Sequence, residues 1–259
     1  MTDQEQPKMP APPKKPFANN EQKIIDDILK NMPSNDAVEC SLPSKNRFYT
    51  LQDPGKPITL RPMTFEDERG MMSKKNVNVD ILNGLLSKCL SNIDVGQLLQ
   101  MDKLYLIMKL REISYGAEYN AGINCPSCKK DNEVQFDLSQ LPVVELGDDF
   151  SNPMIVELPI LKKTIKISIP RVADERYFAN AENAINNLWR FVEEIDGHDQ
   201  KSVISKVIPQ LPLKDAHTLL DAMGASEYGI DTKVRFVCNY CSFNEVMELP
   251  ISADFFTGK

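Results

Sequence analysis

The chain has 259 residues, of which 42% are hydrophobic and 26% are charged, enough apolar material for one large domain or two small ones. A net charge of −7 argues against a protein whose main partner is a nucleic-acid backbone, because such proteins need a basic face. No run approaches the 18 apolar residues of a membrane span, and the polar N-terminus lacks the apolar region of a secretory signal. Six cysteines, four of them in two C-x-x-C pairs, favour an intracellular, reduced, metal-binding protein.

The chain begins with a segment that we expect to form an arm, residues 1–37. Five prolines fall within residues 1–20, which predicts a disordered, partly polyproline-II tail. Residues 21–32 then carry one apolar stripe on a predicted short helix, made of Ile24, Ile25, Ile28 and Leu29. Such a helix is marginal alone, so it either docks on its own domain or serves as a tethered partner-binding helix.

The rest of the chain is predicted to contain two copies of one repeat. Similar landmarks recur in the same order, 107 to 113 residues apart. Each landmark is given for the first copy and then for the second: a strand and a proline before Asp67 and before Asp174; the segments Gly116–Tyr119 and Gly224–Tyr228; the pairs Cys125–Cys128 and Cys238–Cys241; Asn132 and Asn244; and the dipeptides Leu141-Pro142 and Leu249-Pro250. We infer a tandem duplication over about 42–142 and 156–250, with domains at 38–150 and 151–259.

Each repeat is predicted to contain a strand, three helical segments and a β-hairpin, an arrangement typical of an α+β fold. In the first repeat, Thr64 with Asp67 fits a helix start, 79–91 forms a second helix, and Asp102 caps a third helix that ends at Gly116. In the second repeat we expect one long helix over 173–195, with an apolar stripe of Tyr177, Ile185, Leu188, Trp189 and Val192. Shorter helices are predicted at about 200–208 and 213–223.

The paired cysteines carry the strongest local signal. Each C-x-x-C lies between two alternating strands, at 119–124 and 133–138 and again at 233–237 and 245–249, where a hairpin tip can aim both sulfurs at one point. One such zinc knuckle supplies two ligands, so two knuckles complete a four-cysteine, zinc-ribbon-like site for one structural Zn²⁺. The predicted ligands are Cys125, Cys128, Cys238 and Cys241.

Other chemistries for these cysteines are weaker. A redox C-x-x-C needs a helix after its first cysteine, and both pairs are followed by strand-like sequence. Local disulfides are disfavoured in a reducing cell. A catalytic zinc needs an open position with a nearby histidine or carboxylate, and neither His198 nor His217 is near a cysteine in the sequence. Cys89 is predicted to be a core residue.

The sequence offers no catalytic motif: no P-loop, G-x-G-x-x-G, H-E-x-x-H or G-x-S-x-G is present, so we expect no enzymatic activity and no catalytic residues. Zinc ribbons often bind nucleic acid, but charges of both signs surround the knuckles. Lys129 and Lys130 are followed by Asp131 and Glu133, which makes a nucleic-acid partner the less favoured one.

Four segments resemble the baseplate hub proteins of T-even-type contractile-tailed bacteriophages: Ser41–Tyr49, Ile58–Glu68, Asp102–Gly116 and Cys125–Cys128. The first half is the closer match, and Asn46 stands where that family's pattern suggests a glycine. The resemblance implies a non-enzymatic structural component or assembly factor of the tail baseplate hub. Its partners would be other tail or hub proteins, met in the host cytoplasm during assembly and then in the virion tail. The alternative is a zinc-ribbon adaptor that binds nucleic acid or a transcription complex.

Overall fold

A computed structural model of the protein describes residues 18–30, 36–72, 79–224, 228–251 and 253–256. The chain divides into two compact units, residues 1–36 and residues 37–259, which are described separately. Within the described ranges, no helix combines the length and the apolar character that crossing a membrane requires.

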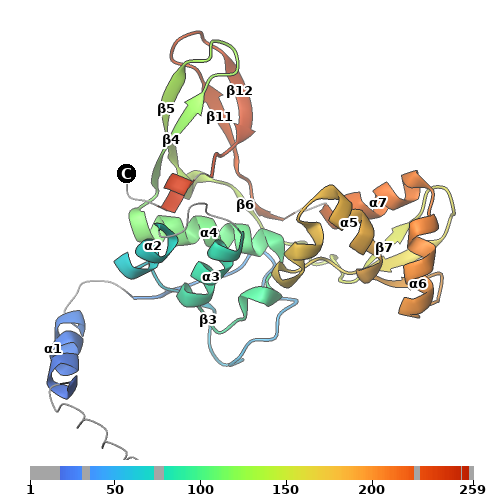
Figure 1. Ribbon diagram of the computed structural model, residues 1–259, viewed down its shortest axis with the longest axis horizontal. Helices are drawn as coiled ribbons and strands as arrows, with labels where there is room; N and C mark the ends of the chain where they lie inside the picture. The colour runs from blue at the N-terminus through green and yellow to red at the C-terminus, as the bar shows by residue number, and fades with distance from the viewer. Residues whose placement is uncertain (1–17, 31–35, 73–78, 225–227, 252, 257–259) are drawn as a thin grey trace, which may run out of the picture. The chain divides into compact units, whose positions relative to one another are not determined.

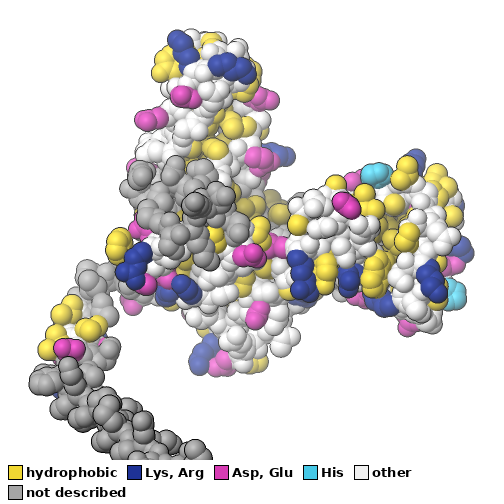
Figure 2. All heavy atoms as spheres, in the orientation of Figure 1, with side chains coloured by type: hydrophobic (Ala, Val, Ile, Leu, Met, Phe, Trp, Pro, Cys, Tyr) yellow, Lys and Arg dark blue, Asp and Glu magenta, His cyan; other side chains and the backbone are white. Residues whose placement is uncertain are grey.

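The described part of the first unit is a single helix, α1 (Ala18–Lys30). It begins inside the segment predicted to be a disordered tail; the remainder of that tail, 1–17, and the end of the predicted helix, 31–32, lie outside the described residues. Three isoleucines of the predicted stripe, at positions 24, 25 and 28, are 52%, 47% and 59% exposed. Figure 2 shows exposed apolar side chains on this helix, and the side chain of the fourth stripe residue, Leu29, lies outside the described ones.

The second unit begins with a small antiparallel sheet in the order β1-β2-β3. Its strands are β1 (Val38–Glu39), β2 (Thr59–Leu60) and β3 (Leu90–Ser91). The helices of this half are α2 (Phe65–Met72), α3 (Val79–Cys89) and α4 (Gln100–Tyr115). A hairpin follows, β4 (Glu118–Asn124) with β5 (Asp131–Asp137), close to the predicted bounds.

The start of α2 is as predicted, whereas the start of α4 is not. The Asp67 carboxylate accepts from the Thr64 backbone N–H at 3.0 Å, which satisfies a donor at the helix N-terminus. Helix α4 begins two residues before Asp102, so the prediction that Asp102 caps it is wrong. The Asp102 carboxylate instead accepts from the buried Ser44 backbone N–H at 3.0 Å and from the Tyr49 hydroxyl.

The later part of the chain also contains a three-stranded sheet, three α-helices and a hairpin, with one helix before the third strand and two after it. A second antiparallel sheet has the order β7-β8-β9. Its strands are β7 (Met154–Glu157), β8 (Thr164–Ile167) and β9 (Val192–Ile195). The α-helices are α5 (Ala181–Asn187), α6 (Lys201–Val207) and α7 (Leu213–Gly224). A second hairpin pairs β11 (Lys233–Val237) with β12 (Asn244–Glu248).

The prediction of one long helix over 173–195 is wrong. That stretch contains a 3₁₀ segment (Val172–Phe178), then α5, then a second 3₁₀ turn (Leu188–Arg190) and finally β9. The side chain of Asn180 accepts from the Asn183 N–H and starts α5 afresh. Pairing with β8 then takes Val192, which is fully buried, into a strand, so the tertiary contact overrides the helical spacing.

Among the described residues, three groups of buried side chains hold the second unit together. The largest covers the first half and also takes in Phe236, Leu249, Phe255 and Phe256 from the C-terminal part. A second core belongs to the later half and is centred on Ile165, Ile167, Val192, Ile204 and Leu219. A third, made of Leu99, Leu146 and Tyr228, lies where β6 (Val143–Val144) pairs with β10 (Gly229–Ile230). Cys89 is buried, as predicted.

Polar contacts also join the two halves. Lys103 on α4 forms an ion pair with Glu175 at 2.6 Å, and both side chains are largely buried. Arg171 donates to the carbonyls of Gln97 and Phe48 at 2.5 and 3.0 Å. Because buried charges need partners, these contacts restrict how the 3₁₀ segment after β8 can sit against α4.

Candidate metal centre

The two hairpins turn with the same backbone geometry at their tips. In the first, the Cys125 N–H donates to the Lys130 carbonyl at 3.0 Å, and Lys129 adopts a φ of 60°. In the second, the Cys238 N–H donates to the Phe243 carbonyl at 2.8 Å, and Ser242 adopts a φ of 58°. In both tips a left-handed residue directly follows the second cysteine, and the turn presents both thiols on one side.

The structure brings the four predicted ligands together. The hairpins stand side by side (Figure 1), and the Sγ atoms of Cys125, Cys128, Cys238 and Cys241 all lie within 4.8 Å of one another. The distances from Cys125 Sγ to Cys241 Sγ and from Cys128 Sγ to Cys238 Sγ are both 3.7 Å. A disulfide bond is only about 2.05 Å long, so these sulfurs are not bonded.

The sulfur spacing fits a tetrahedral metal. With Zn–S distances near 2.3 Å, tetrahedral geometry separates two ligand sulfurs by about 3.8 Å. The shortest spacings between the hairpins match that value, and each hairpin contributes two thiols to the group. The four cysteines can therefore hold one metal ion that bridges the hairpins.

The site is half enclosed. Cys125 and Cys238 are buried, Cys128 is half-buried and Cys241 is exposed. The Asn132 side-chain oxygen accepts from the Asn239 N–H of the other hairpin at 2.9 Å, and Lys130 lies 4.7 Å from the Tyr240 ring centroid. The sequence placed Asn132 among the repeated landmarks but gave no signal of this contact, because its partner is 107 residues away.

The backbone favours a thiolate at Cys238. Burial raises the pKa of this thiol. The N–H groups of Tyr240 and Cys241 lower the pKa, and the net value is about 6. The Tyr240 N–H lies 3.4 Å from the sulfur. The Lys130 amide lowers the pKa of Cys128, whereas burial and the hydrogen bonds that it shares with the other thiols raise it, to about 11 overall. A divalent cation replaces these shared protons and favours all four thiolates.

The surface of the hairpin tips is of mixed charge. Lys129 and Lys130 are exposed, but Asp131 and Glu133 are exposed beside them, and Figure 2 shows both signs on this part of the surface. The Arg235 guanidinium donates to the Asn244 side chain at 3.0 Å. This pattern lacks the continuous basic stripe that a nucleic-acid interface requires.

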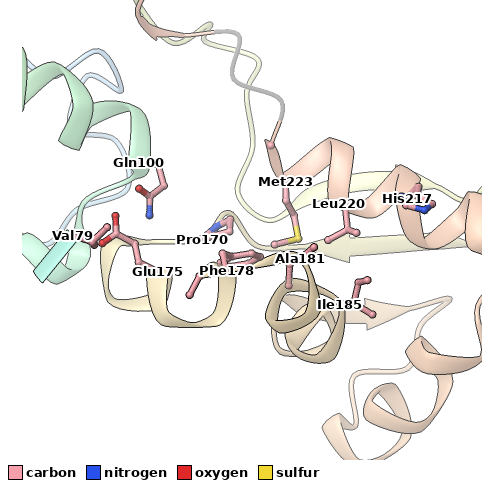
Figure 3. Close-up of a pocket in the computed structure, with 13 residues that line it drawn as sticks. Val79, Gln100, Pro170, Glu175, Phe178, Ala181, Ile185, His217, Leu220 and Met223 are labelled. Carbon is pink, nitrogen blue, oxygen red and sulfur yellow. The ribbon is translucent and has the colours of Figure 1, made fainter. Parts of the chain in front are cut away.

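A second candidate site is a largely apolar pocket of about 710 Å³ between α3 and α4 of the first half and α5 and α7 of the second. Figure 3 shows its two titratable side chains, Glu175 and His217, at opposite ends, with Phe178, Leu220 and Met223 between them. The Glu175 carboxylate is already engaged by Lys103 and by the Asn83 amide, at 2.6 and 2.8 Å. The pocket therefore does not place an acid and a base where they could act together.

The fold and the site define an α+β protein in which two hairpins, far apart in sequence, bring four cysteines to a site that can hold a metal ion. Residues 42–257 match a protein family described as T4 bacteriophage base plate protein. This match covers most of the chain, so the protein belongs to that family of phage baseplate proteins. No curated protein and no solved structure matches the chain. Family membership gives the protein a place in the phage tail baseplate and baseplate proteins as partners.

Proposed function

We propose that the protein is a non-enzymatic component or assembly factor of the baseplate hub. The observation that carries the proposal is the joining of the two hairpins by one four-cysteine site in a protein of the baseplate family. A metal that cross-links two cysteine pairs separated by 109 residues makes a stiff projection, which suits a part of the protein against which other proteins dock. The host cytoplasm is the place where such a factor would act during tail assembly.

The bound metal in this proposal is one structural Zn²⁺. Four thiolates in a tetrahedron are typical of structural zinc, and a complete ligand set leaves no position for a substrate. Elemental analysis of protein purified without chelator should find one zinc per chain. Absence of zinc from a chain with four free thiols at these positions would contradict the assignment.

We also propose that the second unit arose by duplication, with domains at 38–150 and 151–259 and the arm at 1–37. Three features support this: the two three-stranded sheets share one strand order, the two hairpin tips share one turn, and Asp67 and Asp174 each accept from the backbone N–H three residues earlier. One landmark departs from the scheme, since Tyr119 lies within β4 whereas Tyr228 precedes β10. Superposition of the two domains tests the proposal.

The hub assignment is tested with purified particles. Mass spectrometry of mature tails and of assembly intermediates should detect the chain in hub-containing intermediates, and its presence or absence in mature tails separates a component from an assembly factor. The matched genetic test replaces the chain with Cys238→Ser, using Glu133→Gln on the same projection as control. If the serine variant folds without metal and still supports normal tail formation, the metal-joined hairpins are not required for assembly, and the proposal is contradicted.

A further inference from the structure

Two turns in the second unit share a buried leucine followed by proline and a lysine in the left-handed region. The turn after β1 begins with Leu42-Pro43, and the turn after β7 begins with Leu158-Pro159; both leucines are buried, with exposures of 2% and 0%. Each turn then contains a lysine in the left-handed region, Lys45 with φ 55° and Lys162 with φ 53°. The turns differ in length by one residue, since the Lys45 N–H donates to the Leu42 carbonyl at 2.8 Å whereas the Lys162 N–H donates to the Leu158 carbonyl at 3.0 Å.

A buried aspartate ties each turn to a helix. Asp102, the third residue of α4, accepts from the Ser44 N–H at 3.0 Å. Asp215, the third residue of α7, accepts from the N–H groups of Ile160 and Leu161 at 2.7 and 3.0 Å. Since both carboxylates are fully buried, each turn is held rigidly against the start of its helix.

The first turn is covered by the segment that connects the two halves. The Leu146 N–H donates to the Pro43 carbonyl at 2.8 Å, and the Leu146 side chain is buried beside Leu99. Lys45 lies 3.5 and 3.2 Å from the carboxylates of Glu145 and Asp148. Residues 143–150 thus dock as an acidic strip that begins with the strand β6, buries one leucine and ends in a turn at 147–150, and Pro43 is buried beneath the strip.

The second turn lacks such a cover among the described residues. Ile160, Leu161 and Leu213 are 53%, 45% and 78% exposed. Leu213 lies beside the turn because Asp215, two residues later, binds it. Lys162 and Lys214 are exposed and, within the described ranges, form no ion pair. We call Ile160, Leu161, Lys162, Leu213 and Lys214 the second-turn surface.

We propose that the second-turn surface binds an extended, acidic segment carrying a leucine, supplied by another baseplate protein. Its apolar side chains and unpaired lysines complement the chemistry that covers the first turn. The matching segment of a second copy, 143–150, is already bound to its own chain. Residues 1–20 contain no leucine, Leu29 belongs to the helix α1 and not to an extended segment, and Phe255 and Phe256 are buried in the first half, so these parts of the chain are poor occupants.

The identity of the partner as a baseplate protein rests on the proposed function; the chemistry of the surface does not. The test uses the full-length, zinc-loaded chain and a labelled synthetic peptide with the sequence of residues 143–150. We expect saturable binding that weakens as salt rises, because the lysine contacts are exposed. Leu213→Asp and Lys162→Glu should each weaken binding at least tenfold. The matched controls, Ile155→Asp on β7 and Lys206→Glu on α6, should leave it unchanged, and all four positions are exposed in the folded chain.

Three outcomes would overturn the proposal: no binding at millimolar peptide, binding that Leu213→Asp leaves unchanged, or self-association of the chain that Leu213→Asp abolishes. The last outcome would assign the surface to a second copy. Far-ultraviolet circular dichroism and melting temperature show that each variant is folded. Because the measurement needs no phage, its failure leaves the hub proposal standing, whereas absence of the chain from hub intermediates bears on that proposal alone.

Discussion

Metal removal should separate the hairpin tips before it unfolds the rest of the protein. Among the described residues, the polar contacts between the tips other than those of the thiols are the Asn239 N–H to Asn132 hydrogen bond and the Lys130–Tyr240 contact. Each is worth about 1 kcal/mol, so without metal these polar contacts favour the closed arrangement of the tips by only about 2 kcal/mol. That corresponds to tips open for about 3% of the time.

A bound zinc ion changes this balance by several powers of ten. Structural zinc contributes on the order of 10 kcal/mol in small peptides. The contribution is smaller here because each hairpin also has a packed base, where the Tyr119 hydroxyl donates to the Pro250 carbonyl at 2.7 Å. Taking about 5 kcal/mol for the metal, opening of the tips becomes between a thousand and ten thousand times rarer.

The Asn239 amide reports this opening, since its hydrogen bond crosses from one hairpin to the other. Hydrogen exchange at this amide should accelerate at least a thousandfold when a chelator removes the metal or when Cys238 is replaced by serine. Exchange at Tyr119, within the β4–β5 ladder, should change much less. Equal exchange at Asn239 with and without metal, in a chain with free thiols, would refute the reasoning.

Three further outcomes are expected. Asp102→Ala should lower the free energy of unfolding by about 2–4 kcal/mol, because the substitution leaves the fully buried Ser44 amide and the Tyr49 hydroxyl without an acceptor. Urea unfolding measures this loss. The control Asp102→Asn keeps an acceptor and should lower the free energy of unfolding by less. Burial raises the pKa of Asp67, but its arginine and threonine partners lower it to about 2, below its unfolded value of 3.8, so its stabilisation of about 2 kcal/mol is complete above pH 4 and lost as the pH falls toward 2. In Asp67→Asn, unfolding measured over that interval should depend less on pH, and an unchanged slope would contradict the assignment. Deletion of residues 1–33 should leave the zinc-bound body folded and weaken co-assembly with other tail proteins, so normal tails in a complementation assay would place the capturing surface on the body.

The two hairpins and the meeting of their four cysteines could be predicted because the signals for them are local and occur twice. Alternation defines each strand, the C-x-x-C pair defines each tip, and the matching order suggested that the tips meet. The prediction of a long helix over 173–195 is wrong because the deciding contact is not local. The strand β9 forms by pairing with β8, which lies earlier in the chain. Asp102 resembled a helix cap, and its true partners at Ser44 and Tyr49 are more than 50 residues away. No periodicity in the sequence reveals such contacts.

The burial of Phe255 and Phe256 in the core of the first half has a consequence during translation. Tyr115 donates to the Phe256 carbonyl at 2.9 Å, and the Phe255 ring packs on Tyr119 with centroids 4.9 Å apart. Domains usually fold in turn as they leave the ribosome, the N-terminal one first. Here the core of the first half lacks two of its largest side chains until residue 256 has been made. A prematurely terminated chain would therefore expose an incomplete core to chaperones and proteases, so few truncated copies would survive to compete for a place in the tail.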